Sequence, residues 1–241
     1  MSSFQALATA VAAQVGTGNV AGTATALVSG GPGALFWLWV AAFFGMATIF
    51  AEAVLAQTFK TTDEHGHVVG GPAYYITRGM GPKFKPLAAF FSIAIIIALG
   101  CIGNMVQSNS ISKGMHTAFD IPLLVSGIVT AILAGLVFFG GVRRLASVTE
   151  KLVPIMAAIY LLGGTYVILC HIDLVGSAFE LIFTAAFNPQ AMAGGALGLT
   201  VAKAMQFGVA RGLFSNEAGM GSTPHAHAIA KVEHPAEQGL V

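Results

Sequence analysis

The first 51 residues contain no Asp, Glu, Lys or Arg. Soluble domains carry charges on about a quarter of their residues, so an uncharged stretch this long is not typical of a water-exposed fold. The rest of the chain follows the same trend: 9% of its 241 residues are charged, 56% are apolar, and the mean hydropathy is +0.79. A helix crosses a bilayer with about 20 apolar residues. We therefore interpret the chain as a polytopic, all-α membrane protein.

Several function classes are excluded by what the sequence lacks. A net charge of +1 gives no basic excess for nucleic acid as a partner. There is no phosphate-binding loop, nucleophile elbow or zinc-protease motif, so we predict that the chain is not an enzyme and holds no cofactor. Cys101 and Cys170 lie in apolar runs and are interpreted as small buried hydrophobes. The pairs His65/His67 and His225/His227 have no third ligand beside them and are interpreted as solvated histidines.

The apolar runs divide the chain into six predicted spans. Residues 173–188 fit a helix at the membrane interface, and residues 223–241 form a polar tail. We treat residues 1–241 as one incomplete transmembrane domain. The predicted spans are 3–29, broken near 16–19, then 34–59, 86–112, 121–142, 152–172 and 191–212, with a further break near 212–222.

The basic residues predict the orientation of these spans. Segments 60–85 and 143–151 contain seven Lys and Arg residues, whereas the segments between the other spans contain Lys113 alone. Loops on the cytoplasmic side carry the excess of Lys and Arg. We therefore expect 60–85, 143–151 and the C-terminal tail to lie in the cytoplasm, in a protein of the cell inner (plasma) membrane.

The first predicted span is interrupted by Gly16-Thr17-Gly18-Asn19, close to the depth of the bilayer centre. Each glycine costs a helix about 1 kcal/mol relative to alanine. In lipid, a broken helix is tolerated only where it lines a cavity or is covered by protein. The freed N–H groups attract a carboxylate and the freed carbonyls suit a small cation. The alternative is close helix packing through small residues.

A second interruption follows the sixth span, at residues 212–222. Broken helices at corresponding places in two halves of a chain indicate the binding site of a secondary transporter. The alternative is an ordinary helix end. In the third span, Asn104, Gln107, Ser108 and Asn109 form either a substrate-facing stripe or a ladder of hydrogen bonds between helices.

Charges close to the membrane are candidates for function. Glu52 is either a coupling carboxylate or, as we favour, a helix-end residue paired with a basic side chain. Arg211 and Glu217 flank the second interruption, where they fit a gate or a structural ion pair. Lys203 is assigned no function.

Four blocks of the sequence resemble the sodium:alanine symporter family. They are Val15 to Asn19, Gly30 to Gly45, Gly70 to Ile76 and Arg211 to Gly221. Leu38 stands where the family signature usually has Met, a change that conserves volume. The resemblance covers essentially the whole chain.

The resemblance implies the first half, core helices 1–6, of a leucine-transporter-type (amino acid–polyamine–cation) fold with five-plus-five inverted repeats. It implies inward symport of a small neutral amino acid (alanine, glycine or serine) with Na⁺ as the coupling ion. The substrate residues it implies are Gly16, Thr17, Gly18 and Asn19, facing Ser215, Asn216 and Met220. We add Gln107 to them. The sodium ligands it implies are the carbonyls of Ala12 and Val15 and the side chain of Asn19.

Members of this family are about twice as long as this chain, so we expect it to be an N-terminal and central fragment that does not transport alone. The alternative is a non-transporting membrane module, or a half-transporter that needs a partner. Proton coupling in place of sodium stays open. A channel is disfavoured because two midplane breaks are typical of alternating access.

Overall fold

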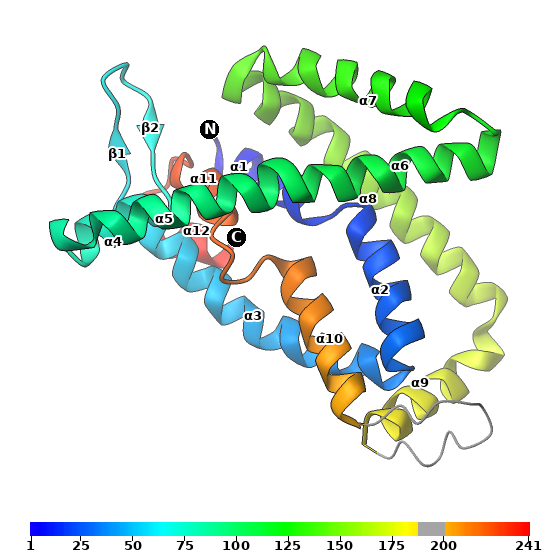
Figure 1. Cartoon of the computed structure of the whole chain (residues 1–241). Helices are drawn as coiled ribbons and strands as arrows, with labels where there is room; N and C mark the ends of the chain where they lie inside the picture. The colour runs from blue at the N-terminus through cyan, green and yellow to red at the C-terminus, as the bar shows by residue number, and fades with distance from the viewer. Residues whose placement is uncertain (188–200) are drawn as a thin grey trace. The chain divides into compact units, whose positions relative to one another are not determined.

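The computed structural model describes residues 1–187 and 201–241 (Figure 1). Apart from one two-stranded hairpin, the regular structure in these ranges is helical, as expected for an all-α membrane protein. Its elements are α1 (Ser3–Gln14), α2 (Thr17–Gly30), α3 (Gly33–Thr58), β1 (Thr61–Thr62), β2 (Val68–Val69), α4 (Pro72–Gly79), η1 (Pro82–Phe84), α5 (Lys85–Ile95), η2 (Ile96–Gly103), α6 (Asn104–Phe119), α7 (Leu123–Phe138), α8 (Gly141–Cys170), α9 (Ile172–Phe187), α10 (Val201–Asn216), α11 (Thr223–Ala228) and α12 (Pro235–Leu240).

Within the described ranges, three helical stretches have the length and apolar composition to cross a membrane. They are α3, the continuous rod from Pro82 to Phe119, and α8. Helix α7 is apolar but shorter. Their apolar side chains are mostly exposed, as on a surface that faces lipid. Cys101 and Cys170 are also exposed, so our interpretation of them as buried was wrong. A lipid-facing helix surface accepts the same small apolar residues that a core does.

The helices differ from the predicted spans in one instructive place. Segment 143–151, which we expected to connect two spans, forms the beginning of α8, a single helix of 30 residues. Its arginines, leucine, alanine, glutamate and lysine all favour a helix. Pro154 lies inside α8, where it removes one backbone hydrogen bond without ending the helix. The first part of the sixth predicted span, 191–200, lies outside the described residues.

The described chain forms two compact units. The first contains residues 1–18, 48–153 and 219–241, and the second contains residues 19–47 and 154–218. The chain passes from one to the other within α3 and within α8, and at both interruptions predicted from the sequence.

The first unit contains the rod formed by α5, η2 and α6, which Figure 1 shows as one continuous helix. Its middle segment, η2, is π-helical. The β1–β2 hairpin pairs Thr61 with Val69 and Thr62 with Val68. Helix α4 packs against α5, and α11 packs against α1.

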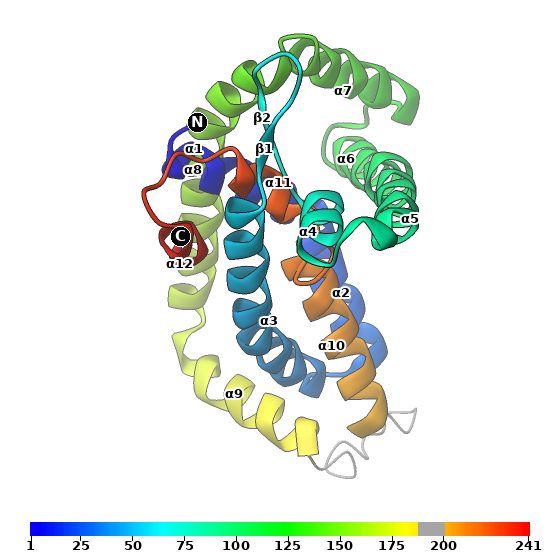
Figure 2. The same cartoon turned by 90° about the vertical axis from the view of Figure 1, so that its left-hand side faces the viewer.

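The second unit packs α10 against α2 and the first half of α3 (Figure 2). Helix α10 presents a buried stripe of small residues, Ala204, Gly208 and Gly212, spaced four residues apart. A Cβ added to Gly212 would stand 2.8 Å from the Ala41 Cβ. Small residues at this spacing let two helix backbones approach closely.

Candidate functional site

The first interruption lies between α1 and α2, at Val15 and Gly16. Val15 leaves the helical conformation with φ −93° and ψ 101°, while its N–H still donates to the Val11 carbonyl at 2.8 Å. A helix end leaves its last carbonyls, and a helix start its first N–H groups, without partners in the same helix. By this rule the last carbonyls of α1, among them that of Ala12, and the first N–H groups of α2 have no partner within their own helix.

The Gln107 side chain, on α6, lies directly against Gly16. A Cβ built on Gly16 would stand 2.9 Å from both Cδ and Oε1 of Gln107 and closer still to Nε2. The glycine at position 16 thus leaves the space that the end of the Gln107 side chain occupies. Of the predicted substrate residues, these two are brought into contact within the first unit.

The second interruption occupies residues 217–222, between α10 and α11. Three of its residues have positive φ angles: Glu217 (53°), Gly219 (84°) and Gly221 (76°). Two of the three are glycines, which adopt this conformation at little cost. Glu217 adopts it as a buried residue just past the end of α10, with 8% of its surface exposed.

Glu52 on α3 supports the second interruption. Its Oε2 accepts a hydrogen bond from the Gly219 N–H at 3.3 Å, and the residue is 8% exposed. Sequence reasoning favoured a basic partner for Glu52 and did not anticipate this backbone donor. The missed signal was a buried carboxylate facing a segment whose N–H groups have no helical partners. The charge of Glu52 also acts on Tyr75 of α4, whose pKa is raised to about 12, mainly by burial and then by Glu52.

A hydrogen bond joins the flanks of the two interruptions. Gln14, the last residue of α1, donates from Nε2 to Oγ1 of Thr223, the first residue of α11, at 2.8 Å. Thr223 is 3% exposed. This pair was also missed, because residues 209 positions apart share no local pattern.

In the second unit, α2 and α10 run antiparallel. Gly22 lies beside the Arg211 side chain, with 3.7 Å between its added Cβ and Arg211 Cδ, and Gly30 lies beside Phe207 and the Lys203 carbonyl. Moving forward along α2 therefore means moving backward along α10. Asn19, one turn before Gly22, consequently lies at the same end of the pair as Ser215 and Asn216.

The side-chain amide nitrogen of Asn216 is buried at this end of the α2–α10 pair. Within the described part of the chain its Nδ2 is buried and has no hydrogen-bond partner. A Cβ on Gly45 of α3 would lie 3.6 Å from that nitrogen. Leaving a buried amide without a partner costs about 1–3 kcal/mol, so such a group calls for an explanation.

The predicted site residues therefore fall into two groups. Ala12, Val15, Gly16, Thr17, Gly18, Gln107 and Met220 belong to the first unit, and Asn19, Ser215 and Asn216 belong to the second. For Thr17 the structure describes the backbone alone.

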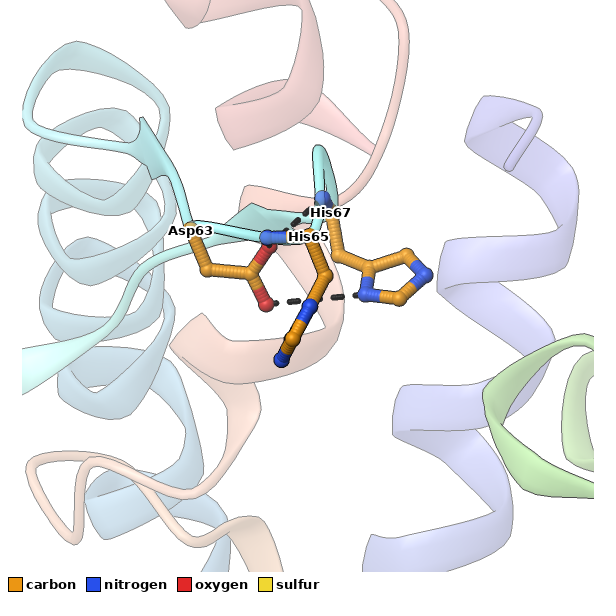
Figure 3. A network of polar contacts seen from close by, with 3 residues as sticks. All are labelled: Asp63, His65 and His67. Atoms are coloured by element: carbon orange, nitrogen blue, oxygen red, sulfur yellow. Dashed lines mark hydrogen bonds and ion pairs between the residues drawn. The ribbon is translucent and has the colours of Figure 1, made fainter.

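One histidine pair belongs to the tip of the β1–β2 hairpin (Figure 3). Asp63 Oδ1 accepts from the N–H groups of His65 and His67, at 3.0 and 2.7 Å, and Oδ2 lies 3.5 Å from His67 Nδ1. The His67 N–H holds the pKa of Asp63 below its ordinary value. These contacts give the aspartate a local role in shaping the turn.

The other pair is not solvated as we expected. His227 is 4% exposed, and its Nδ1 lies 2.7 Å from Gln238 Nε2. His225 Nδ1 lies 3.0 Å from the Gly70 carbonyl, against the glycine at 71. Burial lowers the pKa of both histidines. The expectation failed because α11 packs into the first unit instead of forming part of a free tail.

Comparisons with known proteins agree with the sequence motifs. The model of the sodium:alanine symporter family matches residues 1–241. An uncharacterized transporter of Haemophilus influenzae is 48% identical over 100% of this chain and 53% of its own length. The sodium/alanine symporter AgcS of Methanococcus maripaludis is 46% identical over 100% of the chain and 53% of its own. The putative sodium/proton-dependent alanine carrier protein YrbD of Bacillus subtilis is 45% identical over 100% and 48%.

The chain spans about half the length of these curated relatives. The matched family is one of membrane transporters and not of enzymes, in line with the helical, apolar structure. With the family model matching the whole chain and relatives above 40% identity along all of it, this chain belongs to the sodium:alanine symporter family.

Proposed function

We propose that the protein carrying this sequence moves a small neutral amino acid into the cell together with Na⁺. Alanine is the first candidate, with glycine and serine as alternatives of similar size. The proposal rests on family membership and on the names of two relatives, one called a sodium/alanine symporter and one a putative sodium/proton-dependent alanine carrier. We place the protein in the cell inner (plasma) membrane, with 60–85, 143–151 and the tail in the cytoplasm.

The observation that carries the proposal is the pair of helix interruptions whose flanks are joined by Gln14 and Thr223. Breaks of this kind supply N–H groups for a carboxylate and carbonyls for a cation without any charged side chain. An amino acid and a sodium ion need both. The proposed fold is the first half of a leucine-transporter-type inverted repeat.

In this proposal, the N–H groups from Gly16 to Gly18 hold the substrate carboxylate, and Gln107 and Thr17 lie beside it. The carbonyls of Ala12 and Val15 and the side chain of Asn19 hold sodium. The role of Gln107 is supported by the position of its amide, which lies against Gly16.

A role in binding is also supported for Asn216, whose Nδ2 is buried and has no hydrogen-bond partner among the described residues. A ligand that accepts a hydrogen bond would satisfy that nitrogen.

Ser215, Asn216 and Met220 contact the remainder of the substrate. Met220 follows two positions of unusual backbone and has an adaptable side chain, which suits a residue that limits substrate size.

The test is uptake of labelled alanine into proteoliposomes, made with the longest natural reading frame that contains this sequence. An inward sodium gradient is expected to drive uptake, and a pH gradient without sodium is not. Uptake driven by the pH gradient alone would replace sodium by protons as the coupling ion. In that case Glu52→Gln becomes the variant to examine.

The alternative is that the 241-residue chain is a module or half-transporter that needs a partner. Its half-length match to the relatives favours testing it separately. We expect the chain alone to show no sodium-dependent uptake, because free backbone groups of the breaks need covering in lipid. Uptake by the chain alone would overturn this expectation.

A further inference from the structure

Three basic side chains lie in and beside the turn between α4 and α5, and no acidic residue is close to them in the sequence. Arg78, Lys83 and Lys85 lie within residues 78–85, which we call the basic turn, and all three side chains are exposed. Residues 65–119 contain no Asp or Glu. Among the described residues, neither Lys83 nor Lys85 has a carboxylate partner. The basic turn is therefore an uncompensated patch.

The structure holds the three cations at one place. Helix α4 packs against α5, so the end of α4 and the start of α5 are neighbours. Gly81, with φ 100°, makes the reversal between them. Arg78 donates to Thr61 Oγ1 at 2.7 Å and to the Lys60 carbonyl at 3.4 Å. A guanidinium has five N–H donors, so these two bonds fix its position and leave donors for an anion.

Exposed apolar side chains accompany the charges. Met80 is 54% exposed, Phe84 39% and Leu87 46%. Large apolar groups and cations interleaved on one surface are typical of segments that lie at the level of lipid headgroups.

The rod that begins at Pro82 fixes the depth of the turn. Its 38 residues span about 57 Å at 1.5 Å per residue, whereas the hydrocarbon core is about 30 Å thick. Its apolar part begins directly after Lys85 and runs to Gly103, before the polar residues of α6. The basic turn thus stands at the end of the hydrocarbon-matched segment, where phosphate groups of the bilayer lie.

We propose that the basic turn binds the phosphate-bearing headgroup of an anionic phospholipid. Lys83 and Lys85 supply two point charges, Arg78 supplies oriented N–H donors, and the apolar neighbours contact the upper acyl chain. A lysine near an anionic surface contributes attraction worth about a fivefold change in affinity. This inference does not depend on transport.

The test measures which lipid the purified 241-residue chain retains. The chain is incubated in detergent with equal parts of phosphatidylglycerol and phosphatidylcholine, and retained lipid is counted by native mass spectrometry. We expect a preference for phosphatidylglycerol. The variant Lys83→Gln/Lys85→Gln should reduce that preference by about fivefold for each lysine.

Two variants control for charge and place. Lys83→Arg/Lys85→Arg keeps both charges and should keep the preference. Lys113→Gln removes an exposed lysine of the same rod. Lys113 lies about 42 Å beyond Lys85 along the helix axis, and hence past the opposite side of the hydrocarbon core. This variant should leave the lipid preference unchanged. Equal retention of both lipids by the unmodified chain would overturn the proposal. So would an undiminished preference in the glutamine variant.

Discussion

A Cβ added at Gly16 would collide with Gln107, because the end of that side chain occupies the space in which the Cβ would stand. The obstacle is the end of a flexible side chain, so alanine at this position displaces Gln107 and leaves the backbone in place. A change here therefore tests the contact itself.

If the proposed site is correct, Gly16→Ala displaces the Gln107 amide from the substrate carboxylate, and loss of one such hydrogen bond costs about 1.5 kcal/mol. We therefore expect the variant to lower sodium-dependent alanine uptake at least about tenfold, in the longest natural reading frame that contains this sequence. Uptake in proteoliposomes gives the comparison. Gly163→Ala is the control, because its added Cβ meets no atom within 4 Å. Equal uptake by both variants would remove Gln107 from the site.

His227 is held in its neutral form by its neighbours. Ser3 Oγ donates to Gln238 Oε1 at 2.8 Å, so the amide nitrogen of Gln238 faces His227 Nδ1 as a donor. The ring nitrogen must then accept, and a proton on it would face an N–H group. Gln57 Nε2 donates to the His227 carbonyl, which fixes the backbone at the same place.

This arrangement predicts a pH dependence of stability. Burial lowers the pKa of His227 and His225 in the folded protein, so the unfolded chain binds more protons as pH falls through its ordinary histidine value near 6.5. The stabilisation is complete above about pH 6.5 and is lost below it. Asp63 has a lowered pKa and loses its contribution only near about pH 4. Thermal unfolding in detergent should therefore give a lower midpoint at about pH 5.5 than at about pH 7.5.

Gln238→Glu separates His227 from the other groups. A carboxylate accepts from protonated His227 and raises its pKa, so this variant should lose less stability on acidification than the unmodified chain. An equal loss in both proteins would show that His227 does not cause the dependence.

Some features of the candidate site could be predicted from the sequence, and others could not. Glycine-rich stretches predict where a helix is interrupted, as at Gly16 and Gly219. The contacts Gly16–Gln107 and Gln14–Thr223 depend on how distant helices pack, which no local pattern encodes. His227 was assigned to solvent because composition around it is polar, yet tertiary packing buries it.

Helix α10 packs through its small residues. The added Cβ of Gly208 would stand 2.7 Å from the Trp37 Cβ and would press on the Ala34 carbonyl, so the obstacle includes backbone. Relief requires that α10 move away from α3.

Gly208→Ala should lower the free energy of unfolding by about 1–3 kcal/mol, the usual cost of overpacking. Gly163→Ala, which lies on α8 in open space, should not lower it. Denaturant unfolding in detergent compares the two. Equal stability of both variants would contradict close packing of α10 on α3.

The hydrogen bond between Gln14 and Thr223 ties α1 to α11. Removing it leaves the half-buried amide of Gln14 without this partner, so Thr223→Val should cost about 1 kcal/mol. In a double-mutant cycle with Gln14→Leu, the two changes should be non-additive by about 0.5–1.5 kcal/mol. Strict additivity in the same unfolding assay would show that the pair makes no energetic contribution.

Helix α8 shows that hydropathy predicts the membrane-spanning segment but not the ends of the helix that contains it. Charges at 143–151 mark a membrane boundary by composition, but they do not end a helix, and Pro154 only removes one hydrogen bond. Hydropathy locates the hydrocarbon segment, while helix ends are set by caps and turns such as Asp120 with φ 56°.

For the molecule as a whole, the proposed function depends on backbone groups at the two helix interruptions. The two interruptions coincide with two of the four places where the chain passes from one compact unit to the other. Family membership supplies the class of activity, and the described contacts supply candidate residues, with Asn19 and Asn216 at one end of the α2–α10 pair. The chain spans about half the length of its relatives, so the proposed activity is tested on the longest natural reading frame that contains it.

The most direct measurement is sodium-driven alanine uptake by proteoliposomes, made with the longest natural reading frame that contains this sequence, comparing Asn19→Ala with Gly163→Ala. Gly163 lies on α8, where an added Cβ meets no atom within 4 Å, and it serves as the control. In the proposed site, loss of the Asn19 oxygen beside a desolvated cation should reduce uptake by Asn19→Ala at least about tenfold. The Gly163 variant should transport normally. Near-normal sodium-dependent uptake by Asn19→Ala would contradict the proposed binding site.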